Sequence, residues 1–280
     1  MPAEYLWLLP LGLLIGAFGT LIGAGGGFVL VPILLLVYPN EKTELITGIS
    51  LAVVFFNALS GSLAYARMKR VDYKSGILFS IATIPGAILG ALSTAYVPRG
   101  VFDLLFGVLM IVAAIYLWTS GGEESAVRSY RKGDSDSDPR RRRMLRDLTD
   151  AEGVRYHYAY NPVTGVLLSL VVGFISSLLG VGGGFIHVPI LTRLLDFPVH
   201  IATATSHFVL AIMSLTGTLV HVAQGVFVRG IRRTTMLAIG VLIGAQGGAW
   251  MSNRIGGKMI IRGLAVALAF VGVRLIVSVL

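Results

Sequence analysis

Two glycine triplets set in apolar sequence are the residues of this chain best suited to binding chemistry. They lie in GAGGGFVLVPIL, residues 23–34, and in GVGGGFIHVPIL, residues 180–191, which begin 157 residues apart. Glycine is about 1 kcal/mol less favourable than alanine inside a helix, so a triplet predicts a break. The N–H groups freed there, and the positive end of the half-helix dipole, favour an anion. The candidate anion-binding residues are Gly25, Gly26 and Gly27 in the first copy and Gly182, Gly183 and Gly184 in the second.

Close helix packing is the alternative explanation for glycines in apolar sequence. Small residues let two helix backbones approach each other. This alternative suits isolated glycines such as Gly12, Gly16 and Gly107. For the duplicated triplets, each followed by Val-Pro, we favour a binding site.

A pair of hydroxyl residues follows each triplet. The phrases TGIS and TATS place Thr47 with Ser50 and Thr203 with Ser206, each pair one helical turn apart. A hydroxyl can donate to an oxyanion without carrying a fixed charge. The alternative is that each hydroxyl bonds to its own helix or to a neighbouring helix.

Three histidines lie in the apolar part of the second half. His207 directly follows Ser206, His187 lies in the second glycine phrase where the first has Leu30, and His221 lies further along. Ionisable residues at membrane depth are candidates for function, and histidine changes its charge near neutral pH. We therefore expect His207 to contact the anion or to move a proton. The alternative for each histidine is a neutral ring bonded to a carbonyl.

The composition is that of a membrane protein. Mean hydropathy is +0.81 and 13% of residues are charged, against about 25% in soluble domains. The net charge of +9 comes from loops and one polar insert, which indicates orientation in a membrane and not nucleic-acid binding. There is no cysteine. We find neither a nucleotide-binding loop nor a metal motif, so the sequence predicts no enzyme and no cofactor.

The elements that hold these residues form two similar halves. GAILGA at 86–91 matches GAQGGA at 244–249, at nearly the same offset as the glycine phrases. We predict an all-α polytopic integral membrane protein of two homologous repeats, each with about four hydrophobic segments. The segments are 5–38, 44–66, 75–96, 101–119, 162–195, 200–223, 234–251 and 260–280. The predicted domains are an N-terminal membrane repeat at 1–119, a charged flexible cytoplasmic linker at 120–160 and a C-terminal membrane repeat at 161–280. A regulatory or lipid-binding role is the alternative for this linker.

The first segment of each repeat is too long for one straight crossing. Residues 5–38 would form a helix of about 51 Å, whereas the hydrocarbon core is about 30 Å thick. We therefore expect a break at the glycine triplet. Each broken segment either crosses, which makes the halves parallel, or turns back, which makes them inverted. The distribution of basic residues fits both, and we expect four crossings per half.

The glycine phrases, the TGIS and TATS phrases and the two GAxxGA segments together resemble the TauE/SafE family of sulfite and organosulfonate exporters. The resemblance covers both halves and excludes the linker. It implies a secondary transporter in the cell membrane that exports small sulfur-containing anions. The alternatives are an anion channel, a permease for another small organic anion, and a membrane scaffold. The expected partners are a small anionic substrate, protons as a candidate coupling ion and the lipid bilayer; a homo-oligomer is left open.

Overall fold

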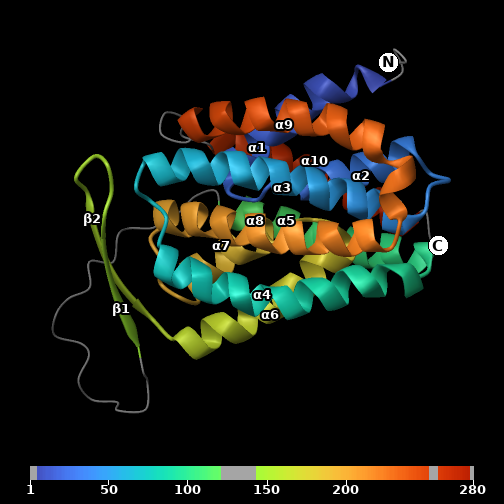
Figure 1. Ribbon diagram of the computed structural model, residues 1–280. Coiled ribbons are helices and arrows are strands. Elements are labelled where there is room, and N and C mark those ends of the chain that lie inside the picture. Colours follow the sequence, from blue (N-terminus) through green and yellow to red (C-terminus); the bar gives the residue numbers. More distant parts are fainter. Residues whose placement is uncertain (1–4, 121–142, 252–257, 278–280) are drawn as a thin grey trace.

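The chain folds almost entirely into helices (Figure 1). The computed structural model describes residues 5–120, 143–251 and 258–277. The first half contains α1 (Leu8–Ile22), α2 (Gly27–Val37), α3 (Thr43–Arg67), α4 (Tyr73–Ser93), the 3-10 turn η2 (Thr94–Tyr96) and α5 (Arg99–Ser120). The strands β1 (Met144–Thr149) and β2 (Arg155–Tyr160) follow. The second half contains α6 (Pro162–Leu179), α7 (Gly184–Arg193), α8 (Val199–Ala223), η3 (Val226–Arg229), α9 (Ile231–Met251) and α10 (Lys258–Val277).

This architecture confirms the predicted all-α polytopic membrane protein. Each predicted hydrophobic segment coincides with one helix or with one pair of helices joined at a glycine triplet. Six of the described helices are long and apolar enough to cross a bilayer. The order of helices is the same in both halves; that the halves are homologous repeats stays a prediction.

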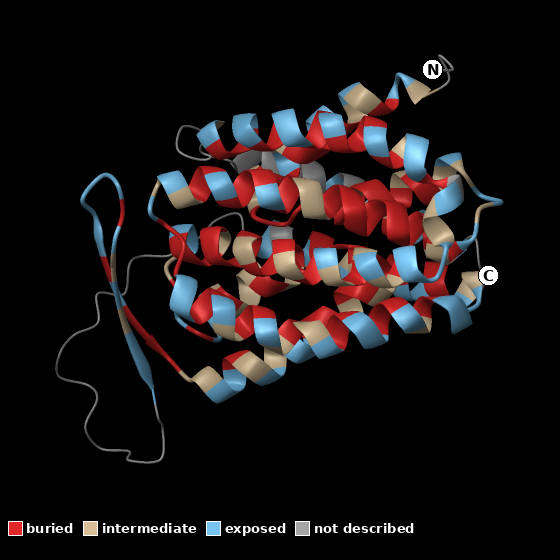
Figure 2. Cartoon of the chain, viewed as in Figure 1, coloured by how far each residue is buried: buried red, intermediate tan, exposed pale blue. Residues whose placement is uncertain are grey.

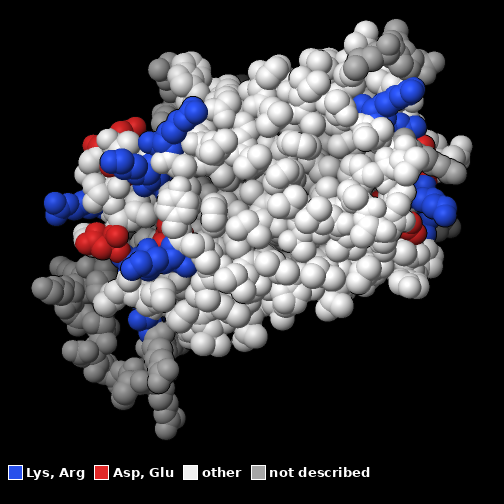
Figure 3. Space-filling view, in the orientation of Figure 1, with Lys and Arg blue, Asp and Glu red and all other residues white. Residues whose placement is uncertain are grey.

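Charged side chains gather at the two ends of the molecule. Between them, the face seen in Figure 3 is a broad band without lysine, arginine, aspartate or glutamate. Large apolar side chains on the outside of the helices are more than half exposed, among them Ile81, Val112 and Leu219. Because such a surface is unfavourable in water and favourable in lipid, the band marks the part of the molecule inside the bilayer.

The two halves are inverted relative to each other. Gly48, near the start of α3, lies against His221 near the end of α8. Gly61, near the end of α3, lies against His207 near the start of α8. The two central helices therefore run in opposite directions.

The pair α6–α7 turns back to the end of the molecule at which it began. α6 begins directly after β2, and Phe197, just after α7, packs on two rings of β2. Its ring centroid lies 4.5 Å from that of Tyr158 and 5.0 Å from that of Tyr160. Both ends of the pair are thus at the hairpin.

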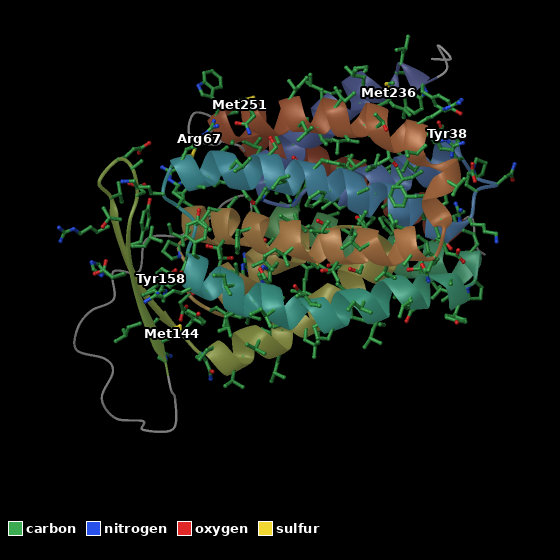
Figure 4. All side chains as sticks on the ribbon, viewed as in Figure 1. Tyr38, Arg67, Met144, Tyr158, Met236 and Met251 are labelled. Carbon is green, nitrogen blue, oxygen red and sulfur yellow. The ribbon has the colours of Figure 1, made fainter. Side chains whose placement is uncertain are left out.

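The pair α1–α2 turns back at the opposite end. Leu9 packs against Gly240 and Ala17 against Gly248, so α1 runs in the same direction as α9 and its N-terminus points to the end of the molecule that holds the start of α9. Arg233, also at the start of α9, stacks 4.0 Å over the ring of Tyr38, which ends α2. Figure 4 shows Tyr38 at the end of the molecule far from Arg67, Met144 and Tyr158. The expectation of four crossings per half is therefore wrong. The crossing helices are α3, α4 and α5 in the first half and α8, α9 and α10 in the second, and each broken pair is re-entrant, although α6 by itself is long and apolar enough to cross.

The isolated glycines Gly12, Gly16 and Gly107 lie at contacts between helices, as the alternative explanation predicts. A Cβ atom on Gly12 would lie 2.5 Å from the carbonyl oxygen of Leu237, so α1 and α9 touch backbone to backbone. A Cβ atom on Gly86 would lie 2.1 Å from the carbonyl oxygen of Leu170, which joins α4 and α6 in the same way. The first helix of each half thus packs along the fourth helix of the other half, α1 along α9 and α6 along α4.

Part of the predicted linker is ordered. β1 and β2 form an antiparallel hairpin, so the interpretation as a flexible linker is corrected for residues 144–160; residues 121–142 lie outside the described part of the chain. Asp150 in the hairpin turn pairs with Arg70 at 3.3 Å, and the N–H of Ala151 donates to the carbonyl of Met68 at 3.0 Å. The alternating aromatic residues of β2 face the helices. The overall polarity of the linker sequence gave no indication of this packing.

Candidate functional site

The two glycine breaks meet in the interior of the molecule. All residues from 23 to 27 and from 180 to 184 are buried, and the buried interior around them is seen in Figure 2. A Cβ atom on Gly27 would lie 2.2 Å from the carbonyl oxygen of Val181. One on Gly184 would lie 2.3 Å from the carbonyl oxygen of Gly23. Glycine is therefore required at both positions because each break passes directly over the backbone of the other.

The second break leaves donors of the backbone free. α6 ends at Gly180, whose φ is +68°, and α7 begins at Gly184. Among the described residues, no group accepts a hydrogen bond from the N–H of Gly184 or Phe185. These groups point out of the positive end of the α7 dipole, which favours a negative charge.

A small cavity lies at this N-terminus. It offers about 10 Å³ to the centres of water-sized molecules, room for about one water. Its lining comes from α4, α6, the second break, α7 and α8: Thr83, Val172, Gly183, Gly184, His187, Ser206, Val209, Leu210 and Met213. Each of the side chains is at most 3% exposed. None of these residues is acidic, so the cavity does not repel an anion.

Unpaired polar atoms face this region. Within the described chain, the hydroxyl of Ser206 and Nδ1 of His187 are buried and have no hydrogen-bond partner. The hydroxyl of Ser176 is likewise unpaired, and a Cβ atom on Gly183 would lie 3.0 Å from it. Buried polar groups are normally paired, so three unpaired ones beside a helix N-terminus indicate a place for a polar ligand.

At the first break, by contrast, side chains fill the space around the open backbone. The amide of Asn57 donates to the carbonyl of Gly25 at 2.8 Å and accepts from the hydroxyl of Thr20 at 2.8 Å. Leu30 occupies the position that matches His187 and is fully buried. A Cβ atom on Gly26 would lie 2.6 Å from Cγ2 of Ile15. Side chains thus fill the space that is open at the second break.

The predicted hydroxyl pairs have separate surroundings. Ser206 lines the cavity, but Ser50 donates to the carbonyl of Gly180 at 2.6 Å and so stabilises the tip of α6. Thr47 donates to the carbonyls of Thr43 and Glu44 in its own helix, as the alternative explanation predicts. Thr203 lies against Gly23 at the tip of the first break.

The predicted histidine is not at the cavity. His207 packs edge-on against the ring of Tyr65, with centroids 5.5 Å apart, and lies over Gly61. The histidine on the cavity is His187, whose Nε2 lies 3.2 Å from the hydroxyl of Ser169. Sequence reasoning also missed Thr83 and Ser176. The sequence contained one indication of Ser176. Two serines, Ser176 and Ser177, precede the second triplet, and the matching positions in the first copy are Gly19 and Thr20.

An all-α, multi-pass architecture with paired broken helices is typical of membrane transporters that move a small molecule. A family model described as Sulfite exporter TauE/SafE matches residues 8–275. The chain belongs to this family.

Curated relatives bear names of the same kind. "Probable membrane transporter protein YunE" of Bacillus subtilis is 32% identical over 279 residues, covering 98% of this chain and 97% of the relative. A probable membrane transporter protein of Methanocaldococcus jannaschii is 28% identical over 223 residues, covering 76% of this chain and 72% of the relative. No solved structure matches the chain.

Proposed function

We propose that this protein is a secondary transporter that exports small sulfur-containing anions, such as sulfite or organosulfonates, and that the anion binds at the second glycine break. The supporting observation is the joint position of three donors: the free N–H groups of α7, the unpaired hydroxyl of Ser206 and the imidazole of His187. An oxyanion with several acceptor oxygens pairs with such converging donors. The family's description as sulfite exporters supports the choice of substrate.

Alternating access suits this architecture. Transporters with inverted halves bind their substrates where discontinuous helices meet near the bilayer midplane. The cavity holds about one water molecule, so the helices around it must separate to admit an oxyanion. A closed, buried cavity favours a transporter over an anion channel, whose pore is open while it conducts.

The hairpin end faces the cytoplasm in this proposal. Its described part carries the basic loop between α3 and α4 and Arg143, Arg146 and Arg155, and basic residues favour the cytoplasmic side. A negative interior then favours the exit of any anion that crosses with its charge uncompensated. Because the chain has no cysteine, single cysteines at Val154 and Val228, probed with an impermeant thiol reagent on intact cells, test the orientation. Labelling of Val228 alone is expected, and labelling of Val154 alone contradicts the proposal.

Flux through the purified protein in liposomes tests the function. Vesicles preloaded with sulfite should release it at a rate that saturates with concentration and falls when a small organosulfonate competes. Competition by a small carboxylate alone points to the alternative permease for another organic anion. A rate that never saturates points to the channel, and a rate equal to that of protein-free vesicles contradicts an anion transporter.

A further inference from the structure

His187 differs from every other residue at the cavity in that its charge can change. It is 3% exposed, Nε2 faces the hydroxyl of Ser169 at 3.2 Å, and Nδ1 has no partner among the described residues. The matching residue in the first break is Leu30. A polar ring in a membrane interior with an unused nitrogen on a cavity is a functional feature by default.

The groups around His187 supply no charge. From α4 the ring edge of Phe79 meets it, with centroids 5.8 Å apart. The side chains that share the cavity with it on the packed elements are Thr83 on α4, Val172 on α6, and Ser206, Val209, Leu210 and Met213 on α8. None of these can be ionised. Of the side chains that line the cavity, His187 alone can therefore present a full positive charge to a bound anion.

We propose that His187 takes up a proton when the anion binds, so that the anion and one proton cross together. The proton comes from the aqueous phase that the anion leaves, resides on the imidazole, and is released with the anion on the other side. Both nitrogens of the imidazolium donate: Nε2–H to the hydroxyl of Ser169 and Nδ1–H to the anion. For a monovalent anion the transported pair carries no net charge. This inference rests on the proposed anion site.

Proton movement in liposomes tests the coupling. Methanesulfonate is the probe because its own charge is constant between about pH 5 and 8, the range in which histidine titrates. With a pH-sensitive dye inside, wild-type vesicles should show one proton moved with each sulfonate, and a potassium diffusion potential should leave the rate unchanged. The variant His187→Gln keeps a hydrogen-bond donor but cannot carry the proton. It should transport sulfonate without protons, at a rate that now follows the imposed potential.

Two comparisons make the result decisive. His207→Gln changes a buried histidine away from the cavity and should retain proton movement. Ser169→Ala removes the acceptor for Nε2–H, so the protonated ring of His187 becomes less stable relative to the neutral ring. The pH at which flux is half-maximal should then fall by about one unit, a tenfold change in proton concentration.

The outcomes separate the inference from the function on which it rests. Wild-type vesicles that move neither sulfite nor methanesulfonate contradict the proposed anion transporter. Wild-type flux with the same proton movement in His187→Gln overturns the role of His187. If His187→Gln does not fold, an unchanged pH midpoint in Ser169→Ala overturns it instead.

Discussion

The two glycine breaks share a sequence phrase and a backbone geometry, but they differ in what stands behind the backbone. At the first break, the amide of Asn57 donates to the carbonyl of Gly25, and fully buried Leu30 occupies the position that matches His187. At the second, His187 and Ser206 leave polar atoms unpaired on a cavity.

This difference separates the structural use of a glycine break from its use in binding. Opening a helix exposes N–H groups in both copies, so the backbone alone does not make a site. The side chains around the opening either fill the space in front of these groups or leave room there for a ligand. In this chain we assign the first break to the structure and the second to the substrate.

The largest predicted effect is common to both breaks. Gly27→Val and Gly184→Val each place a side chain against a carbonyl of the other break, at 2.2 and 2.3 Å from ideal Cβ positions. Backbone atoms cannot move aside as side chains do, so each variant should lose more than about 3 kcal/mol and yield little folded protein. Size-exclusion chromatography of the solubilised protein measures this. Gly247→Val is the control, since a Cβ atom there meets open space; a normal yield for either break variant disproves the crossing.

The next prediction separates the breaks. The φ of Gly183 is −57°, so alanine fits its backbone, but its Cβ atom would lie 2.8 Å from Cγ1 of Val172, in the cavity wall. In Gly183→Ala, the added methyl group should displace the anion from part of its donors and so reduce flux at least about tenfold, the equivalent of one hydrogen bond to a charge, with little change in melting temperature. The φ of Gly26 is +81°, where alanine costs about 1–2 kcal/mol. Gly26→Ala should lower the melting temperature while the KM of the remaining flux is unchanged. The same pattern in both variants removes the distinction between the breaks.

The fold could be predicted from the sequence because its signals are strong and local. Apolar segments of membrane length predicted the hydrophobic helices, and the glycine triplets predicted where two of them break. Pro32 and Pro189, by contrast, lie inside α2 and α7 and mark no break. The direction of each break could not be predicted, because the distribution of basic residues fits both topologies. It depends on contacts between segments distant in sequence, such as Arg233 on Tyr38.

The site was predictable only in part, for a related reason. Matching of the halves pointed to Ser50 and Ser206 alike, yet one is paired with Gly180 and the other is unpaired. Whether a hydroxyl is free depends on the packing of the opposite half. His207 drew more weight than His187 because it directly follows Ser206, and neither histidine has a counterpart in the first half. Only the packing of the helices shows that His187 is the one on the cavity.

Two serine substitutions test the difference between the two breaks at single atoms. Ser50→Ala leaves the buried carbonyl of Gly180 without its donor at 2.6 Å, so it should destabilise the protein by about 1 kcal/mol and leave the KM unchanged. Ser206→Ala removes a hydroxyl that has no partner within the described structure, so stability should hold while KM rises about tenfold, as for the loss of a hydrogen bond to a charge. Thermal melts and saturation of sulfite flux measure the two effects. An equal rise in KM for both variants contradicts the assignment.

Asp72, at the membrane edge, is hydrogen-bonded to the helix that carries Ser206 of the proposed site. The N–H of Asp72 donates to the hydroxyl of Thr205, the neighbour of Ser206, at 3.0 Å, and its carboxylate accepts from Arg146 of the hairpin and from Tyr158 at 2.6 Å. Burial alone would raise the pKa of Asp72, but the hydrogen bonds from Arg146, Ser75 and Tyr158 outweigh it and hold the pKa below the ordinary 3.8. The folded protein therefore prefers the ionised carboxylate.

The smallest predicted effect on flux follows from removing the ion pair between Arg146 and Asp72. Arg146→Gln should lower stability by about 1–3 kcal/mol at pH 7, the range for hydrogen bonds to charged groups, and change flux less than threefold because the cavity itself is intact. A group with a lowered pKa stabilises the fold fully above its unfolded value of about 3.9 and loses this contribution as the pH falls through the folded pKa. The difference in melting temperature between wild type and Arg146→Gln should thus be constant from pH 8 to about pH 5 and shrink below about pH 4. A difference that persists at pH 3 means that the hairpin is held by its aromatic contacts with Phe197 and not by the ion pair.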